Sequence, residues 1–420
     1  MNLRLRAAIA GLVMVFAPTV APGDDSFLLK DGDHVVFYGD SITDQLLYTT
    51  FTETYAVTRY PQYSLSFTHS GWGGDRVGGG AGGSIDRRLA RDVVAYRPSV
   101  VTIMLGMNDA SYLPFKQETF DRYASGYRHI VEELKLDLPG VRLTLIKPSP
   151  YDDVTREPKF EDGYNSVLLR YADFISDLAK TNGATIADLN NPVVEATKKA
   201  YAIDREKATK FNPDRIHPGN AGQLIMAQAL LKAWNAPSLV SAVALDAKEG
   251  KILSADKATV SELAKADETV SWTQLDESLP FPVDLKDPVT ALATQTSDFF
   301  NALDRQFLKV DGLDASEYVL SIDRDDVGTF SKDQLNSGIN LAEQVTPMTK
   351  QAIEVHKLTL RHNNLHKLRW RQVQVPHQTA KSEHLAQALE GLDGIEEEMV
   401  DQQRATAQPK AHKFVLKPKS

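Results

Sequence analysis

Residues 35–43 read Val-Val-Phe-Tyr-Gly-Asp-Ser-Ile-Thr, and this stretch decides the fold. Its four apolar or aromatic residues predict a buried parallel strand, and Gly39-Asp40-Ser41 interrupts the run just before a helical pattern that begins near Gln45. The Ser41 hydroxyl is therefore expected at the carboxyl end of a strand, the edge of an open α/β sheet where ligands bind. N–H groups of the following turn favour negative charge there. Ser41 is a candidate nucleophile; the alternative is an ordinary helix N-cap.

Apolar runs alternate with amphipathic stretches over residues 35–235. Strands that alternate with helices in this way require right-handed crossovers and a parallel sheet covered on both faces. The sequence therefore predicts an α/β fold, a three-layer α/β/α sandwich with a parallel five-stranded sheet. The expected strands lie at 35–38, 65–69, 99–106, 142–146 and 184–189, and the expected helices at 45–60, 84–96, 123–134, 164–178 and 218–234.

Composition restricts the class of protein and the chemistry. The chain has 420 residues, enough for two domains, and its 42% hydrophobic and 25% charged residues are typical of a soluble globular protein with a substantial core. A net charge of −9 argues against nucleic acid as a partner, because phosphate binding needs clustered Lys and Arg. The absence of cysteine excludes disulfides, thiolate catalysis and thiolate metal sites.

The N-terminus has the pattern of a secretory signal peptide over residues 1–23. Arg4 and Arg6 precede an apolar run at 7–17, and small residues suited to cleavage follow near 21–23. The alternative, an uncleaved anchor, is disfavoured because the run is too short to cross a bilayer. We therefore expect a periplasmic or secreted protein without integral membrane contact after cleavage.

The alternating pattern stops near Ala236-Pro237. The expected α/β domain covers 24–236, and a smaller α+β region follows at 237–400, mostly helical with a small hairpin near Tyr318–Ile322 and Val327–Phe330. The polar, basic tail at 401–420 is predicted to be disordered.

Two further motifs follow expected strands. Ser70-Gly-Trp-Gly-Gly74-Asp75 comes after the second strand, where glycines allow a backbone N–H to face a cleft, although a flexible loop would have the same composition. Gly106-Met-Asn108-Asp109 ends the third strand, where an Asn amide can donate a hydrogen bond to a developing oxyanion; an Asn-Asp turn is the alternative.

The last motif is Asn212-Pro-Asp214-Arg-Ile-His217, just before the final helix of the α/β region. A His that acts as general base must be held in one tautomer, and a carboxylate three residues earlier can accept its other N–H. Helix capping is the alternative for this motif alone. Because all four motifs fall on one edge of the same expected sheet, an acyl-hydrolase site explains them better.

With these motifs the sequence resembles the GDSL or SGNH hydrolase superfamily over residues 33–235, with Ile42 where the family name has Leu. The resemblance implies an SGNH-hydrolase, flavodoxin-like fold and a serine esterase that needs no metal or organic cofactor. It implies that Ser41 is the nucleophile, His217 the base and Asp214 its orienting group. The implied oxyanion hole consists of the Ser41 and Gly74 N–H groups with the Asn108 amide; Gly74 is chosen within 71–74 because Asp75 follows it.

The resemblance also suggests a substrate class, because exported members often remove acetyl groups from polysaccharides. We therefore expect O-acetyl esters of carbohydrate as substrates. The alternatives are an arylesterase or lipase-like acylhydrolase, acyl transfer by the same site, and a non-catalytic carbohydrate-binding envelope protein.

Two C-terminal patterns raise the question of a metal. Asp323-Arg-Asp325 resembles the start of a calcium loop, but Val327 stands at a ligand position and Gln334 replaces the closing Glu, so a hairpin turn is favoured. His362 and His366 share a helical face, but no acidic partner is evident from the sequence. No metal site is therefore predicted.

Overall fold

The structure, a computed structural model, describes residues 26–379 and 382–419, so the predicted signal peptide lies outside the described residues. A five-stranded sheet in the order β2-β1-β5-β6-β7 forms the centre of the first part of the chain, and every neighbouring pair is parallel. Its strands are β1 (His34–Gly39), β2 (Ser66–Gly71), β5 (Val100–Met104), β6 (Arg142–Ile146) and β7 (Thr185–Ala187).

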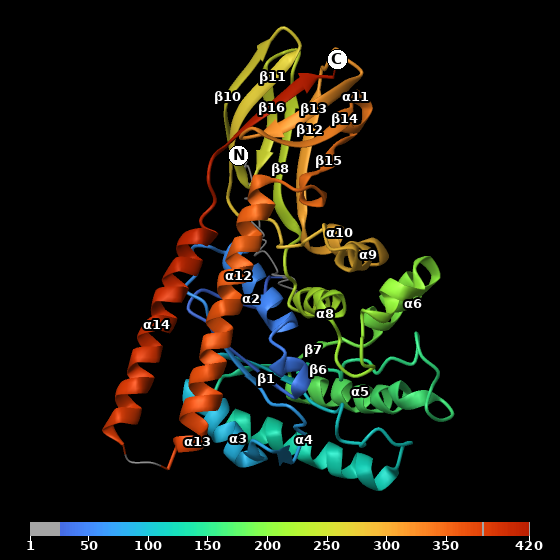
Figure 1. Cartoon of the computed structure of the whole chain (residues 1–420), viewed down its shortest axis with the longest axis vertical. Helices are drawn as coiled ribbons and strands as arrows, with labels where there is room; N and C mark the ends of the chain where they lie inside the picture. The colour runs from blue at the N-terminus through green and yellow to red at the C-terminus, as the bar shows by residue number, and fades with distance from the viewer. Residues whose placement is uncertain (1–25, 380–381, 420) are drawn as a thin grey trace, which may run out of the picture.

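Helices cover both faces of this sheet (Figure 1). The predicted three-layer α/β/α sandwich is confirmed. One face carries α2 (Tyr48–Arg59) and α8 (Asn220–Ala233), and the other carries α3 (Ile85–Asp92), α4 (Gln117–Asp137) and α5 (Gly163–Asn182). Five further elements were not predicted from the sequence: α1 (Ser41–Asp44), β3 (Gly79–Gly80), β4 (Gly83–Ser84), α6 (Asn191–Ile203) and α7 (Arg205–Thr209).

The strand order places a topological switch point beside β1. From β1 the chain crosses to β2 on one side, and β5 then pairs with β1 on the other side. In open α/β sheets, ligands bind in the crevice at the carboxyl ends of such strands. Ser41, Gly74 and Asn108 follow β1, β2 and β5 respectively, so the fold brings them to this crevice.

The region after residue 237 differs from the mostly helical one predicted. It begins with four strands, β8 (Leu239–Asp246), β9 (Lys251–Asp256), β10 (Ala258–Ala266) and β11 (Thr269–Asp276). Alternate residues of β11 are buried, but Gln274 and Asp276 are among them. The Gln274 and Gln306 amides donate to the Asp276 carboxylate at 2.7 and 2.6 Å. These buried polar residues conceal the period of two that predicts a strand.

The C-terminal region contains two sheets, ordered β10-β11-β16-β13-β14 and β15-β12-β8-β9. The strands β13 and β14 form the expected hairpin. The tail predicted to be disordered forms β16, which pairs with both β11 and β13. In β16 the exposed Lys413 and Lys417 lie on the face opposite the buried Phe414 and Leu416. The strand therefore has one apolar face, although its composition is basic. The remaining strands are β12 (Arg305–Asp311), β13 (Glu317–Ile322), β14 (Asp325–Ser331), β15 (Ile339–Asn340) and β16 (His412–Pro418).

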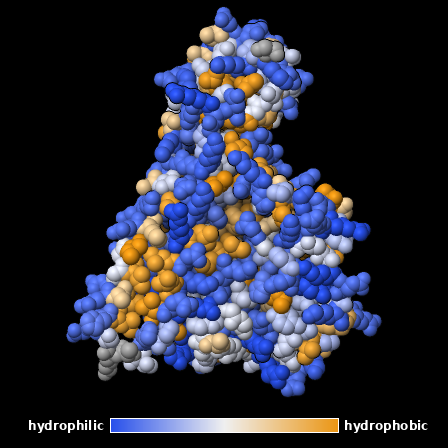
Figure 2. Space-filling model, viewed as in Figure 1, coloured by the Kyte–Doolittle hydropathy of each residue, from blue (hydrophilic) through white to orange (hydrophobic). Residues whose placement is uncertain are grey.

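The long helix α12 (Pro347–Lys367) runs from these sheets along the α/β sandwich and packs against α2, and α14 (Glu383–Ala407) packs against α12 and runs back to β16 (Figure 1). Figure 2 shows hydrophobic residues gathered on the side of the molecule where this helical pair lies. The C-terminal helices are α9 (Pro288–Thr296), α10 (Phe299–Leu303), α11 (Lys332–Ser337), α12 (Pro347–Lys367), its π-helical continuation η3 (Leu368–Gln374), α13 (Val375–His377) and α14 (Glu383–Ala407).

A buried carboxylate joins the helical pair to the sheet. Glu53 of α2 lies 2.9 Å from His69 Nε2 and accepts hydrogen bonds from Asn363 of α12 at 2.9 Å and Gln403 of α14 at 3.1 Å. Burial acts to raise the pKa of Glu53, but the contact with His69 and the other donors outweighs it and lowers the pKa. Burial also lowers the pKa of His69, so a neutral imidazole donates to a charged carboxylate.

The histidines of α12 have packing roles. Glu396 Oε2 lies 3.0 Å from His366 Nδ1 and 3.7 Å from His362 Nε2, an acidic partner that the sequence did not reveal. Across the part of the chain that the structure describes, no group of three or more His, Asp or Glu is placed to hold a metal ion. His356 stacks on Phe51 with ring centroids 4.5 Å apart.

We expect His356 to make the fold sensitive to acid. Burial lowers the pKa of His356 from 6.5 to about 4. Between these two pH values His356 is protonated in the unfolded chain but neutral in the folded protein. The stability present at pH 7 is lost progressively between about pH 6.5 and 4, by roughly 2 kcal/mol from pH 7 to pH 5. His356→Phe should reduce the fall in Tm between those two pH values, measured by calorimetry. The matched control His384→Phe, at an exposed position on α14, should show the same fall in Tm as the unaltered protein. If the fall in Tm were the same in His356→Phe as in His384→Phe, His356 would not be the source of the acid sensitivity.

Candidate active site

Close packing at the end of β1 places Ser41. A Cβ on Gly39 would lie 2.2 Å from Thr43 Oγ1 and 2.8 Å from the Met104 carbonyl, so only glycine allows the chain to turn here. The next residue, Asp40, caps α1 by accepting the Ile42 N–H at 3.0 Å. Ser41 is the first residue of α1, where the helix N-terminus favours negative charge.

The structure brings Ser41, His217 and Asp214 together as predicted. His217 Nε2 lies 2.8 Å from Ser41 Oγ, and His217 Nδ1 lies 2.7 Å from Asp214 Oδ2. Asp214 Oδ1 accepts the backbone N–H groups of Ile216 and His217 at 3.0 and 2.7 Å. Partial burial acts to raise the pKa of Asp214, but the hydrogen bonds from His217 and Ile216 outweigh it and lower the pKa. Asp214 is therefore a fixed, ionised acceptor for the imidazole.

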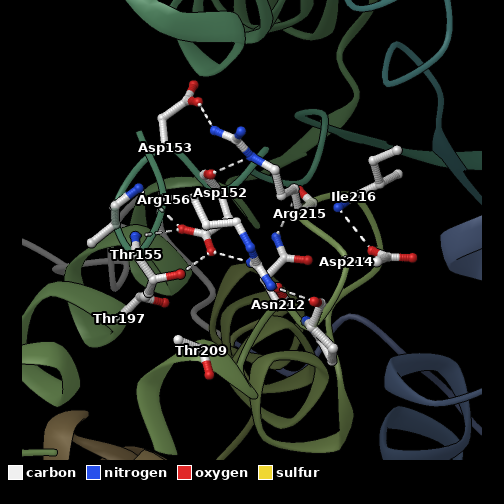
Figure 3. Close-up of polar contacts among 12 residues, drawn as sticks. Asp152, Asp153, Thr155, Arg156, Thr197, Thr209, Asn212, Asp214, Arg215 and Ile216 are labelled. Atoms are coloured by element: carbon white, nitrogen blue, oxygen red, sulfur yellow. Dashed lines mark hydrogen bonds and ion pairs between the residues drawn. The ribbon is translucent and has the colours of Figure 1, made fainter. Parts of the chain in front are cut away.

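Arg215, between Asp214 and Ile216, has a left-handed backbone with φ of +75°. Such a conformation strains a residue other than glycine, so its surroundings must hold it. Its guanidinium donates to Asp153 Oδ1 at 2.9 Å and to the carbonyls of Asp152 and Glu157 at 3.1 and 2.7 Å (Figure 3). Its own carbonyl accepts the Asp152 N–H at 2.9 Å.

Arg156 braces the same turn from the loop after β6. It donates to the Asn212 carbonyl at 2.9 Å and also to the Pro213 carbonyl, while the Asp152 carboxylate holds its guanidinium at 2.9 Å (Figure 3). Sequence analysis did not single out Asp152, Arg156 or Arg215. The available signal was the charged segment at 152–157, which follows the fourth predicted strand. The turn at 212–217 also contains an arginine.

The glycine-rich loop is held from beneath by a buried arginine. Arg88 is completely buried and donates to Asp75 Oδ2 at 2.7 Å and to the Ser70 carbonyl at 2.8 Å. Gly74 precedes Asp75, is exposed and has φ of +77°, a conformation that favours glycine. The loop geometry therefore depends on Gly74, whereas its role as a hydrogen-bond donor stays a prediction.

Hydrogen bonds at both Nδ2 and Oδ1 fix the orientation of the Asn108 amide. Its Nδ2 donates to the Asp75 carbonyl at 3.1 Å, and its Oδ1 accepts the Tyr112 hydroxyl at 2.7 Å. A primary amide has two N–H donors, so the second N–H of Nδ2 is available to a ligand. The structure thus places Asn108 beside the glycine loop, as the sequence predicted for two segments at one sheet edge. Tyr112, which orients this amide, was not predicted.

The C-terminal helices also reach α1. Lys367 Nζ lies 2.8 Å from both the carbonyl and the carboxylate of Asp44, the last residue of α1, and Arg371 Nη1 lies 2.7 Å from the same carboxylate. Trp370 packs edge-on against Trp72 with centroids 5.4 Å apart. The basic stretch at 357–371 therefore contributes in part to the support of the helix that begins at Ser41. None of the helices in the described ranges has the length and apolar composition needed to cross a membrane.

Comparisons with known proteins show what the chain is similar to. Residues 37–225 match the GDSL-like lipase/acylhydrolase family. An acetylxylan esterase from Geobacillus stearothermophilus is 26% identical over an alignment of 225 residues that covers 49% of this chain and 94% of that enzyme. The structure of a gut microbial diltiazem-metabolizing enzyme superposes with a TM-score of 0.81 at 24% identity, covering 94% of this chain and 99% of that one. This last likeness concerns the fold alone, and it includes the C-terminal region.

The matched range contains the end of β1, the glycine loop, Asn108 and the Asp214–His217 turn. This part of the chain is therefore a GDSL-like lipase/acylhydrolase domain, which supports a carboxylic ester hydrolase.

Proposed function

We propose that the protein removes O-acyl groups, chiefly acetyl, from carbohydrate by way of a Ser41-His217-Asp214 triad and an acyl-enzyme. The observation that supports this best is the continuous hydrogen-bonded chain from Ser41 Oγ through His217 to Asp214, with contacts of 2.8 and 2.7 Å. Similarity to an acetylxylan esterase supports carbohydrate as the alcohol part. The signal-like pattern at 1–23 supports a periplasmic or secreted location.

In this mechanism Ser41 Oγ attacks the ester carbonyl while His217 Nε2 takes its proton. Asp214 holds the Nδ1–H tautomer and stabilises the imidazolium that forms. The oxyanion accepts hydrogen bonds from the N–H groups of Ser41 and Gly74 and from the free N–H of Asn108. His217 then returns the proton to the leaving alcohol, and a water activated by the same imidazole hydrolyses the acyl-enzyme.

Exposure of the site suits a large alcohol part. The side chains of His217 and Asp214 are 31% and 56% exposed, so the base side of the triad opens to solvent. A polysaccharide can approach such a site without a closing lid. An arylesterase or lipase specificity, acyl transfer and a non-catalytic envelope protein are the alternatives that the experiments distinguish.

Ser41→Ala should abolish acetate release from acetylated xylan, because no nucleophile remains. Acetate is measured enzymatically, with a long-chain aryl ester as a parallel substrate. Unchanged acetate release by the variant would contradict the triad. Turnover of the aryl ester alone by the unaltered protein would move the function to a lipase or arylesterase.

Asn108→Ala should lower kcat about 10²- to 10³-fold, because one donor to the oxyanion is lost. KM should change little, since this hydrogen bond forms mainly in the transition state. Steady-state kinetics on acetylated xylo-oligosaccharides separate the two constants, and thermal unfolding verifies that the variant is folded. A rise in KM with kcat preserved would assign Asn108 to substrate binding instead.

Tyr112→Phe should lower kcat about three- to tenfold, because the Asn108 amide loses the hydrogen bond that orients it. In an Asn108→Ala background the same substitution should have little further effect. The double-mutant cycle measures this coupling. Independent, multiplicative losses would show that Tyr112 acts elsewhere.

Arg215→Ala should lower kcat by about tenfold or more with KM nearly unchanged, because the turn that fixes Asp214 and His217 loses its anchor. Arg215→Gly is the matched comparison, since it removes the same guanidinium but accepts φ of +75° without strain. Both variants should lose activity, with the glycine variant the more stable in thermal unfolding. Full activity in Arg215→Gly would mean that backbone strain alone, and no side-chain anchor, sets the turn.

A further inference from the structure

We propose that a cationic groove beside the oxyanion segments binds the carboxylate of an acidic sugar, so that the enzyme favours acetylated carbohydrate that carries uronic acid units. This inference rests on the proposed function and specifies its substrate. The groove, called here the Arg76 groove, is lined by the segments 76–79 and 109–114 and by the first half of α4. Its volume of about 630 Å³ is within the usual range of small-molecule sites.

Position links the Arg76 groove to the reaction centre. Its first wall begins two residues after Gly74, and its second wall begins one residue after Asn108. The Val77 N–H donates to Asp109 Oδ1 at 3.0 Å, so the two walls are joined across the floor. A sugar whose ester lies at Ser41 therefore has the groove directly beyond the oxyanion donors.

Tyr112 marks the boundary between the groove and the triad. It follows Ser111, which lines the groove, and its hydroxyl bonds to Asn108. Its phenol is close enough to Asp40, Asp214 and Arg76 for all three charges to act on it. The Arg76 groove and the triad are thus neighbouring parts of one surface.

The charge of the groove is positive, in contrast to the net charge of −9 for the whole chain. Arg76 donates to Ser111 Oγ at 3.3 Å, and within the described residues neither Arg76 nor Lys116 has an acidic partner within 4.0 Å. Arg122 pairs with Glu118 at 2.9 Å on the exposed surface. A guanidinium that lacks an acidic partner offers the planar pair of donors that suits a carboxylate.

Asp109 indicates a carboxylate in preference to a phosphate. Its Oδ2 is buried in the wall and has no hydrogen-bond partner among the described residues. Burial raises the pKa of Asp109 to about 7, so only part of this carboxyl is ionised near neutral pH. The ionised fraction would repel a phosphate dianion more strongly than a carboxylate monoanion.

The test compares two acetylated xylo-oligosaccharides of equal length, one with a glucuronic acid branch and one in which that carboxyl has been reduced to an alcohol. For the unaltered protein, kcat/KM should be about tenfold higher for the acidic substrate at low salt, and the ratio should fall as salt screens the contact. In Arg76→Gln/Lys116→Gln the ratio should fall to near one. The control Lys180→Gln/Arg205→Gln makes the same charge change at exposed positions on α5 and α7 and should keep the ratio.

A ratio near one in the unaltered protein, with Ser41-dependent acetate release from both substrates, would overturn the Arg76 groove and leave the proposed function standing. A loss of the ratio in the control variant as well would overturn it too, because net charge would then explain the preference. Absence of acetate release from both substrates would overturn the proposed function. In that case calorimetric binding of the deacetylated acidic oligosaccharide decides: binding that salt and Arg76→Gln/Lys116→Gln weaken supports the groove, and no binding overturns it.

Discussion

The contact of 2.8 Å between Ser41 Oγ and His217 Nε2 is the constraint that the rest of the structure serves. It joins residues 176 positions apart, and a hydrogen bond weakens within a few tenths of an ångström of misplacement. Ser41 is fixed because Gly39 lets β1 end tightly against Thr43 and Met104. His217 is fixed because Arg156 and Arg215 anchor its turn to the loop after β6. The parallel sheet supplies the common edge where both ends meet.

The C-terminal region supports this site instead of forming a separate module. Lys367 and Arg371 hold the carboxylate that ends α1, and the donors Asn363 and Gln403 satisfy the buried Glu53 of α2. Removing these donors would leave a buried charge unsatisfied, which costs several times more than the loss of an exposed contact. The hydrolase domain of this chain is therefore expected to depend on α12 and α14 for its stability, although the family match ends at residue 225.

The sequence predicted correctly the elements whose residues are mostly apolar and buried. The run at 35–38 and the strand at 142–146 are buried on both sides of the sheet, so composition alone identifies them. The prediction failed where polar residues are buried with partners from distant positions. Gln274 and Asp276 obscure the alternation of β11, because Gln274 donates to Asp276 and the other donor to Asp276, Gln306, is 30 positions away. The residues that hold the Asp214–His217 turn were not predicted for the same reason. Arg215, for example, contacts Asp153, which is 62 positions earlier in the chain.

Acidic side chains behind the nucleophile would oppose an oxyanion if all were charged. Asp40, Asp75 and Asp109 lie close enough to influence one another. Burial raises the pKa of Asp40 and of Asp109 to about 7, so much of their charge is suppressed near neutral pH. The third, Asp75, faces the buried guanidinium of Arg88 at 2.7 Å. In the proposed mechanism, negative charge that develops on a substrate carbonyl would lie where burial reduces the charge of Asp40 and Asp109 and where Arg88 offsets the charge of Asp75.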